Sequence, residues 1–222
     1  MLEVRTGRGK NTLDFRAPEG ISTMIHEPES SLHVVVLAAG SASRFGSPKQ
    51  LARFAGRPLL QSAVSNAVAI GGNAVSVVLG AHAAEVAPLL RNTPATVIVN
   101  RDWEEGMGSS LRAAVRQLPG TCDGLLVLLG DQPAITAEDL RRLTGPWRRR
   151  PDAIVAAAYS GIDGVPAIFP RWVFGELGGL RGDAGARSLI YRHRERLVRV
   201  PMPSATLDID TPADLEASQP PT

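Results

Sequence analysis

The sequence predicts an α/β fold: a single Rossmann-like, three-layer domain around a mostly parallel sheet. Short, almost wholly apolar runs alternate with alanine-rich windows of helical length, a pattern typical of parallel strands covered by helices on both faces. Polar, glycine-containing motifs follow several of these apolar runs. The chain has 222 residues, which is enough for one such domain with a full core.

The expected strands are short apolar or β-branched runs. In chain order they are residues 33–37, 75–80, 96–100, 125–130, 153–158, 165–169 and 197–201. Continuous apolar runs, as opposed to alternating ones, indicate strands that are buried on both faces. Only a short glycine-containing link, residues 160–164, separates the fifth run from the sixth, so we expect an antiparallel excursion near residues 153–169.

The expected helices lie between these runs. In chain order they are residues 58–70, 83–90, 109–118, 136–143, 186–193 and 211–217. Pro58 suits the first turn of its helix. Thr136, with Asp139 three residues later, is typical of a capped helix start with an acidic first turn. A glycine-rich stretch, residues 175–185, precedes the helix at 186–193.

One domain is expected, over residues 32–217. Residues 1–31 show no periodicity and many Gly, Pro, Ser and charged residues, which predicts a disordered leader or a segment foreign to the natural protein. Met24 could itself begin the protein. Residues 218–222 have a similar composition and are expected to form a tail.

Composition argues against several classes of partner. The net charge of +2 gives no case for a nucleic-acid surface, and the basic run at residues 148–150 is interpreted as a solvated helix face. A single cysteine, Cys122, cannot form an internal disulfide. No apolar stretch approaches the ~20 residues that span a membrane, and no signal peptide is visible. A cytoplasmic protein without membrane partners is therefore expected.

The first polar motif follows the strand at residues 33–37 and has the features of a polyphosphate site. Gly40 and Ser41 keep the backbone free of bulk, so that N–H groups can point at phosphate oxygens. Arg44 offers a planar fork of donors, and Lys49 offers a compact positive charge. The spacing is neither that of a Walker A loop nor that of the dinucleotide-binding GxGxxG pattern.

Two acidic motifs suggest a metal site. Asp131 follows the strand at residues 125–130, where a carboxylate would point into the ligand crevice and suit Mg²⁺. Asp208 and Asp210 lie on the same side of an extended segment. The structural alternative is a turn aspartate at 131 and two carboxylates that cap the helix after Thr211.

A third motif, residues 100–111, follows the strand at 96–100 and opens a helix. Gly106 and Gly108 permit close backbone approach, and Ser109 and Ser110 supply hydroxyl and N–H groups at the helix start. This arrangement favours an anion or ribose site, and the alternative is simply a capped helix after a loop. The four histidines show no ligand spacing, and the three tryptophans (Trp103, Trp147 and Trp172) are interpreted as packing residues.

Together these motifs resemble those of the MobA-like nucleotidyltransferases, in the same order along the chain. Residues 100–111 match the family's Asn-x-x-Trp-x-x-Gly-Met-x-x-Ser-Leu, and residues 208–212 match its Asp-Ile-Asp-Thr-Pro. Residues 182–187 match its Gly-Asp-x-Gly-Ala-Arg, while Val165 stands where the family commonly has histidine. The Ala-Ala-Gly form at residues 38–40 is most similar to the molybdenum cofactor cytidylyltransferases of this group.

The resemblance implies a nucleotidyltransferase that transfers CMP from CTP to the terminal phosphate of molybdopterin, with Mg²⁺ as cofactor and release of pyrophosphate. Catalysis would involve Arg44, Lys49 and Asp131, and the metal would lie on Asp131 and Asp210. The nucleotide would be bound by Leu37, Ala38, Ala39, Gly40, Ser41, Arg44, Lys49, Asn100, Gly106, Met107, Ser109 and Ser110. The acceptor would be bound by Gly164, Pro166, Asp183, Arg187 and Asp208.

Other activities stay open at this point. A guanylyltransferase of the same cofactor and a sugar- or alditol-phosphate nucleotidyltransferase would use the same kinds of residue. A non-enzymatic carrier of the molybdenum cofactor is a further alternative, although a carrier needs no triphosphate site. A molybdo-hydroxylase or its maturation chaperone is the expected protein partner, and a dinucleotide-binding oxidoreductase is disfavoured because GxGxxG is absent.

Overall fold

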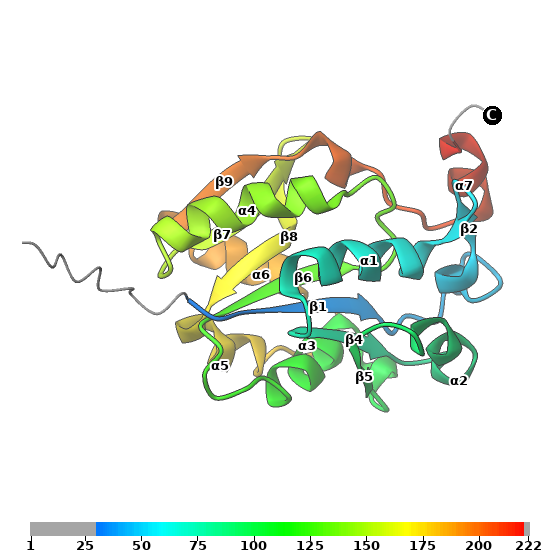
Figure 1. Ribbon diagram of the computed structural model, residues 1–222, viewed down its shortest axis with the longest axis horizontal. Helices are drawn as coiled ribbons and strands as arrows, with labels where there is room; N and C mark the ends of the chain where they lie inside the picture. The colour runs from blue at the N-terminus through cyan, green and yellow to red at the C-terminus, as the bar shows by residue number, and fades with distance from the viewer. Residues whose placement is uncertain (1–29, 220–222) are drawn as a thin grey trace, which may run out of the picture.

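A seven-stranded sheet forms the middle layer of the structure, a computed structural model that describes residues 30–219 (Figure 1). Its strands are β1 (Leu32–Ala38), β4 (Val75–Leu79), β5 (Thr96–Val99), β6 (Gly124–Leu129), β7 (Ile154–Tyr159), β8 (Ile162–Pro170) and β9 (Leu197–Pro201). Each of the seven expected strands is present, within a few residues of its expected bounds. The α/β class with a mostly parallel sheet is thereby confirmed.

The strand order, β5-β4-β1-β6-β8-β7-β9, puts β1 at a point where the chain changes direction across the sheet. From β1 the chain moves outward to β4 and β5, and then returns to β6 on the other side of β1, with both neighbours parallel to it. In such sheets a crevice opens beyond the carboxyl ends of the two strands at the switch point. Strand β8 runs antiparallel to β6 and β7, which confirms the antiparallel excursion.

Helices cover both faces of the sheet. On one face lie α1 (Leu59–Gly71) and α4 (Ala137–Arg149), which contact each other, and on the opposite face lie α3 (Met107–Arg116), α5 (Phe174–Leu177) and α6 (Ala186–Arg192) (Figure 1). The remaining helices are α2 (Ala83–Val86) and α7 (Pro212–Ser218), with short 3-10 turns elsewhere. Within residues 30–219, none of the helices combines the length and hydropathy that crossing a bilayer requires.

Strand β1 divides the core into two halves because successive side chains of a strand point to opposite faces. Val34 and Val36 pack in the cluster under α1 and α4, which also holds Trp147. Val35 packs in the cluster under α3 with Leu111. The three valines have no exposed surface, as the continuous apolar run predicts.

The structure differs from expectation in a few local details. A short hairpin, β2 (Arg53–Phe54) with β3 (Arg57–Pro58), precedes α1 and leaves Pro58 at the N-cap position, not in the first helical turn. Two-residue strands are too short for any hydrophobic period to indicate them. Helix α5 lies partly within the glycine-rich stretch 175–185, and the helix expected at 83–90 is split between α2 and a 3-10 turn.

The expected helix starts and ends are largely present. The Thr136 hydroxyl accepts a hydrogen bond from the Asp139 amide, and Thr211 caps α7 with Asp214 in the same way. Helix α7 ends at Ser218, one residue beyond the expected domain end, and the next side chain, Gln219, donates to the Arg53 carbonyl.

The basic residues 148–150 are exposed, and Cys122 is buried. Most of the expected leader, residues 1–29, and the end of the tail, residues 220–222, lie outside the described residues.

Candidate active site

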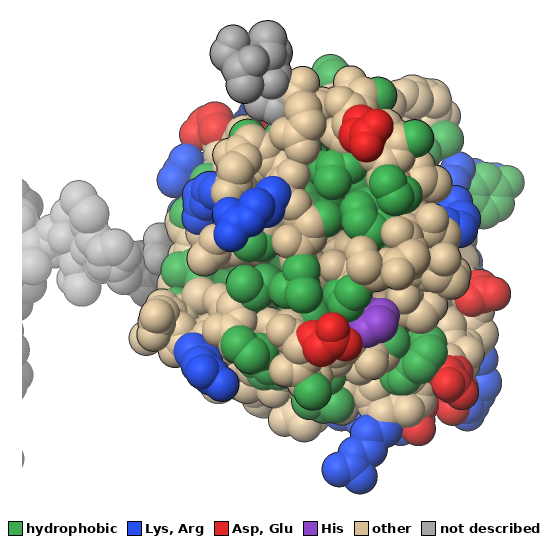
Figure 2. Space-filling view, turned by 90° about the vertical axis from the view of Figure 1, so that its right-hand side faces the viewer, with side chains coloured by type: hydrophobic (Ala, Val, Ile, Leu, Met, Phe, Trp, Pro, Cys, Tyr) green, Lys and Arg blue, Asp and Glu red, His purple; other side chains and the backbone are tan. Residues whose placement is uncertain are grey.

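A cavity of about 560 Å³ lies where β1 and β6 end, at the switch point of the sheet. Its size is within the range of small-molecule sites, roughly 300–1,000 Å³. The walls come from residues 37–44 and 49–50, from residues 129–131, from five residues around the start of α3 (Trp103, Glu104, Gly106, Met107 and Ser110), and from Asp183, Asp208 and Asp210. Figure 2 looks at the side of the molecule toward which β1 points, where acidic and hydrophobic side chains lie side by side.

The loop after β1 is held from behind through its carbonyl groups. Gln50, which is buried, donates from Nε2 to the carbonyl oxygens of Ala38 at 2.9 Å and Gly40 at 3.2 Å. The Nε2 atom of His82 lies 3.0 Å from the carbonyl oxygen of Ser41. A loop whose carbonyl groups are bonded toward the protein can present its N–H groups to an anion. The segment therefore has the backbone support that a polyphosphate site needs.

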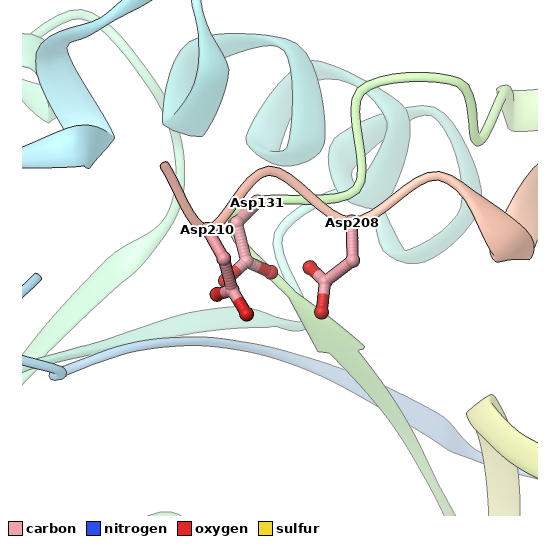
Figure 3. Close-up of side chains that lie close together, drawn as sticks. All are labelled: Asp131, Asp208 and Asp210. Atoms are coloured by element: carbon pink, nitrogen blue, oxygen red, sulfur yellow. The ribbon is translucent and has the colours of Figure 1, made fainter. Parts of the chain in front are cut away.

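Three carboxylates converge at one edge of the cavity. Asp131 lies two residues beyond β6, and Asp208 and Asp210 lie on the segment before α7, where the Ile209 amide donates to the Asp131 carbonyl. One oxygen of each carboxylate lies within 4.8 Å of the others. Figure 3 shows the three side chains directed toward the same region. The structure thus groups Asp208 with the two residues that sequence analysis assigns to the metal.

This set of donors fits a divalent cation. Carboxylate oxygens are the ligands that Mg²⁺ prefers, usually with one or two carboxylates, substrate phosphates and water around one ion. The Oδ1 atom of Asp131 is buried and has no hydrogen-bond partner among the described residues. A buried carboxylate oxygen without a partner is costly unless an additional group contacts it. Asp131, Asp208 and Asp210 could therefore hold Mg²⁺ or a similar ion.

Two basic side chains contact two of these carboxylates, Asp131 and Asp210. The Nζ atom of Lys49 lies 2.6 Å from Asp131 Oδ2 and 3.1 Å from Asp210 Oδ1, and the Nη2 atom of Arg44 lies 2.7 Å from Asp210 Oδ2. Burial alone would lower the pKa of Lys49, but the charge of Asp131 and the hydrogen bonds to the two aspartates outweigh it and raise that pKa. Lys49 is therefore a permanent cation at neutral pH.

Asp208 has an altered ionisation. Enclosure by the protein and, after it, the negative charges of Asp131 and Asp210 raise the pKa of Asp208 to about 7, and Lys49 offsets part of this effect. The side chain is nevertheless solvent-accessible at the edge of the cavity. Like charges at close range disfavour a third ionised carboxylate. A cation bound among the three would favour the ionised form.

The motif at residues 100–111 is divided between the cavity wall and its support. Gly106, Met107 and Ser110 line the cavity. Asn100 is buried, and its Nδ2 atom donates to the hydroxyl oxygens of Ser109 at 2.7 Å and Ser110 at 3.1 Å. Asn100 and Ser109 do not line the cavity, and they lie behind the residues that do. Their local role is to fix the first turn of α3.

The expected acceptor residues are also divided. Asp183 and Asp208 line the cavity, whereas Gly164, Pro166 and Arg187 do not. Arg187 is exposed near the start of α6. The structure therefore brings two of the five into the cavity and leaves three outside it.

Sequence analysis misses several residues of the cavity wall. Trp103, interpreted as a packing residue, packs partly against the core and also lines the cavity. Glu104, Gln50, Ala42 and Ser43 line it as well. Trp103 is the Trp of the matched motif Asn-x-x-Trp-x-x-Gly-Met, which is a signal in the sequence, whereas the other four residues are indicated only by their proximity to the motifs.

Comparison with known proteins gives a consistent result. A sequence model described as the MobA-like NTP transferase domain matches residues 34–197. The chain is similar to the protein named nicotine blue oxidoreductase of Paenarthrobacter nicotinovorans, with 36% identity over 162 residues, which is 69% of this chain and 78% of that protein.

Solved structures are similar over most of the chain. A homologue of Rv0371c from Mycobacterium sp. strain JC1 has a TM-score of 0.75 and 33% identity, over 86% of this chain and 96% of that one. Rv0371c from Mycobacterium tuberculosis H37Rv, in a complex with manganese, has a TM-score of 0.68 and 30% identity, over 86% and 98%.

Proposed function

The chain belongs to the MobA-like NTP transferase family and is a nucleotidyltransferase, and from this premise we propose that it transfers CMP from CTP to the terminal phosphate of molybdopterin, with Mg²⁺ as cofactor. The observation that carries the proposal is the cavity at the ends of β1 and β6, where Lys49 and Arg44 form ion pairs with Asp131 and Asp210 beside a third carboxylate, Asp208. Cations beside carboxylates are what a magnesium triphosphate requires of a protein.

The triphosphate is bound by the loop after β1 and by the two cations. N–H groups of the loop that follows Ala38 would donate to the phosphate oxygens, and Gln50 and His82 hold this segment in place through its carbonyl groups. Arg44 and Lys49 exchange their aspartate partners for phosphate oxygens when the nucleotide binds. Gly106, Met107 and Ser110 contact the nucleoside from the opposite wall. Asn100 and Ser109 contribute by fixing that wall.

Asp131 and Asp210 would hold the magnesium ion, with Asp208 beside them. When bound, the ion supplies positive charge to the phosphate oxygens and to the leaving pyrophosphate. The buried Oδ1 atom of Asp131, which has no hydrogen-bond partner within residues 30–219, and the convergence of the three carboxylates support this assignment. The manganese complex of Rv0371c supports a divalent ion in a related protein.

The reaction joins an oxygen of the acceptor phosphate to the α-phosphorus of CTP and breaks the bond between that phosphorus and the oxygen that bridges to the β-phosphate. Pyrophosphate leaves with the electron pair of the broken bond. A phosphate acceptor is already ionised near neutral pH, so no side chain has to remove a proton. Lys49 and Arg44 reduce the repulsion between the two anions and stabilise the charge that develops on the leaving group.

The acceptor approaches from the side of Asp183 and Asp208. Gly164, Pro166 and Arg187 lie outside the cavity and would contact the more distant part of an acceptor that extends beyond it. The choice of CTP rests on the Ala-Ala-Gly form at residues 38–40, and the choice of molybdopterin rests on the resemblance to the cytidylyltransferases. A molybdo-hydroxylase or its maturation chaperone would receive the product.

The proposal is tested by titrating the purified protein with CTP, GTP, ATP and UTP in a calorimeter, each with Mg²⁺. Selective binding of CTP, followed by pyrophosphate release when molybdopterin is added, supports the proposal. Preference for GTP overturns the choice of base and indicates a guanylyltransferase. Binding of molybdopterin without any triphosphate overturns the enzyme and indicates a carrier.

A redox assay with nicotinamide cofactors belongs in the same series, because the relative from Paenarthrobacter nicotinovorans is named an oxidoreductase. Redox turnover without pyrophosphate release would overturn the proposal. As a matched pair, Asp131→Asn removes one carboxylate charge from the cavity, and Asp152→Asn removes one from an exposed position two residues before β7. Only the first substitution is expected to abolish Mg²⁺-dependent nucleotide binding.

A further inference from the structure

Arg112 is a buried cation outside the cavity. It lies on α3, and its side chain is 9% exposed. Its guanidinium group has two partners on two different segments: Nη1 donates to the Leu180 carbonyl at 3.0 Å, and Nη2 forms an ion pair with the Glu105 carboxylate. Both partners are next to segments that line the cavity, since Gly106 follows Glu105 and Asp183 lies three residues beyond Leu180.

These two segments are also in direct contact. The Gly108 amide donates to the Gly182 carbonyl at 3.0 Å. Gly106 has a φ of +97°, and a Cβ atom placed on it would lie 2.5 Å from Asp183 Oδ1 and 2.6 Å from the Gly182 carbonyl oxygen. The backbones therefore approach as closely as glycine permits. Movement of one segment requires movement of the other.

We propose that Arg112 is a positioning residue that holds the segment 105–108 and the segment 180–183 as one unit, and thereby fixes the separation of the nucleotide wall from Asp183. The kinetic consequence of this role rests on the proposed function, in which Gly106 and Met107 face the nucleotide and Asp183 faces the acceptor.

Arginine is required for this role by its shape. Its planar fork can donate to a carbonyl group and to a carboxylate at the same time, with the two N–H directions fixed relative to each other. Lysine has one nitrogen on a shorter side chain, so Arg112→Lys keeps the charge but cannot hold both segments. Two reactants displaced by about 1 Å can lose on the order of 10²-fold in rate.

The experiment compares Arg112→Lys with wild type by hydrogen exchange and by kinetics. Without any ligand, we expect faster exchange in peptides that cover residues 105–108 and 180–184, including the Gly108 amide, and unchanged exchange in β6. With substrates, kcat is expected to fall by about 10²-fold while the Kd for the nucleotide changes by less than about threefold. Arg116→Lys, at an exposed position of the same helix, is the matched control and is expected to match wild type.

Exchange at wild-type rates in both segments would overturn the proposal, as would an unchanged kcat. Loss of nucleotide affinity in proportion to kcat would also overturn it, since that would indicate general damage to the site. Should Arg112→Lys not fold, Glu105→Gln breaks the ion pair at a half-exposed side chain, and a smaller change in the same direction is expected. A wild-type protein that binds no triphosphate would refute the proposed function, and the ligand-free exchange experiment would still decide the role of Arg112.

Discussion

The ammonium group of Lys49 lies 2.6 Å from the Asp131 carboxylate. The cation expected to bind phosphate and a carboxylate expected to bind metal therefore neutralise each other when neither ligand is bound. Arg44 and Asp210 repeat the arrangement at 2.7 Å. The binding of metal and the binding of triphosphate should consequently be coupled. A metal ion on the aspartates frees Lys49 and Arg44 for phosphate, and a triphosphate on these two cations frees the aspartates for the metal.

Lys49→Met is expected to bind Mn²⁺ about tenfold more tightly than wild type in the absence of nucleotide. The positive ammonium group of Lys49 occupies the carboxylates and repels a metal ion, and the variant lacks it. The same variant is expected to lose affinity for the triphosphate. Calorimetric titration with Mn²⁺ alone and then with nucleotide measures both. Arg91→Met, which removes an exposed cation away from the cavity, is the control. Weaker Mn²⁺ binding in Lys49→Met would show that Lys49 supports the metal and does not compete with it.

Asp131→Ala is expected to fold and to lose turnover by about 10²-fold or more, because it removes a proposed metal ligand and the carboxylate nearest to Lys49. Thermal unfolding by circular dichroism checks the fold, and pyrophosphate release checks the activity. Retained turnover in a correctly folded variant would remove Asp131 from the metal site.

Asp208→Asn is expected to raise the thermal unfolding midpoint at pH 8. The pKa of Asp208 is about 7 in the folded protein and near 3.8 when unfolded, so the folded state binds more protons between these values. The contribution of Asp208 to the stability of wild type therefore falls as pH rises from 4 to 7, and above pH 7 the full cost of its ionised form is present.

Because this carboxylate is solvent-accessible, we expect a rise of only about 2 °C. At pH 4 the variant and wild type should unfold at nearly the same temperature. The measurement is made in the presence of a chelator, since a bound metal would favour the ionised form. A gain of equal size at both pH values would mean that the effect does not come from titration of Asp208.

Gly124→Ala is expected to destabilise the protein by about 1–3 kcal/mol, because the new methyl group would overlap the buried indole of Trp147. Gly120→Ala, a few residues earlier, is the matched control, since a Cβ atom there has no neighbour within 4 Å. Urea unfolding of the two variants gives the difference. Equal stability would show that the indole can move aside at little cost.

The fold and the acidic residues of the site could be predicted from the sequence because their signals are local. Residues 34–37 are apolar without interruption, which indicates a strand buried on both faces, and Asp131 lies two residues beyond another such strand. Strand ends meet at one edge of a parallel sheet, so carboxylates from distant motifs were expected to converge. Asp208, Asp210 and Asp131 do so.

The remainder of the site depends on contacts that no local pattern encodes. His82 contacts the Ser41 carbonyl across 41 positions, and Arg112 contacts the Leu180 carbonyl across 68. Asn100 belongs to a motif that suggested ligand binding, yet its amide is used within the protein. Which side of a loop faces the cavity is decided by packing partners elsewhere in the chain, and the spacing of the loop's own residues does not contain that information.

The reversed strand β8 has a consequence for how such an enzyme can diversify. Because β8 runs against its neighbours, its first residues lie at the same edge as the end of β7, and a tight turn at Ser160 and Gly161 joins the two. Lengthening a surface turn costs little free energy, whereas lengthening a crossover helix would disturb the packing of a whole layer. New contacts for a different second substrate could therefore be added at this turn while the triphosphate half of the sheet stayed unchanged.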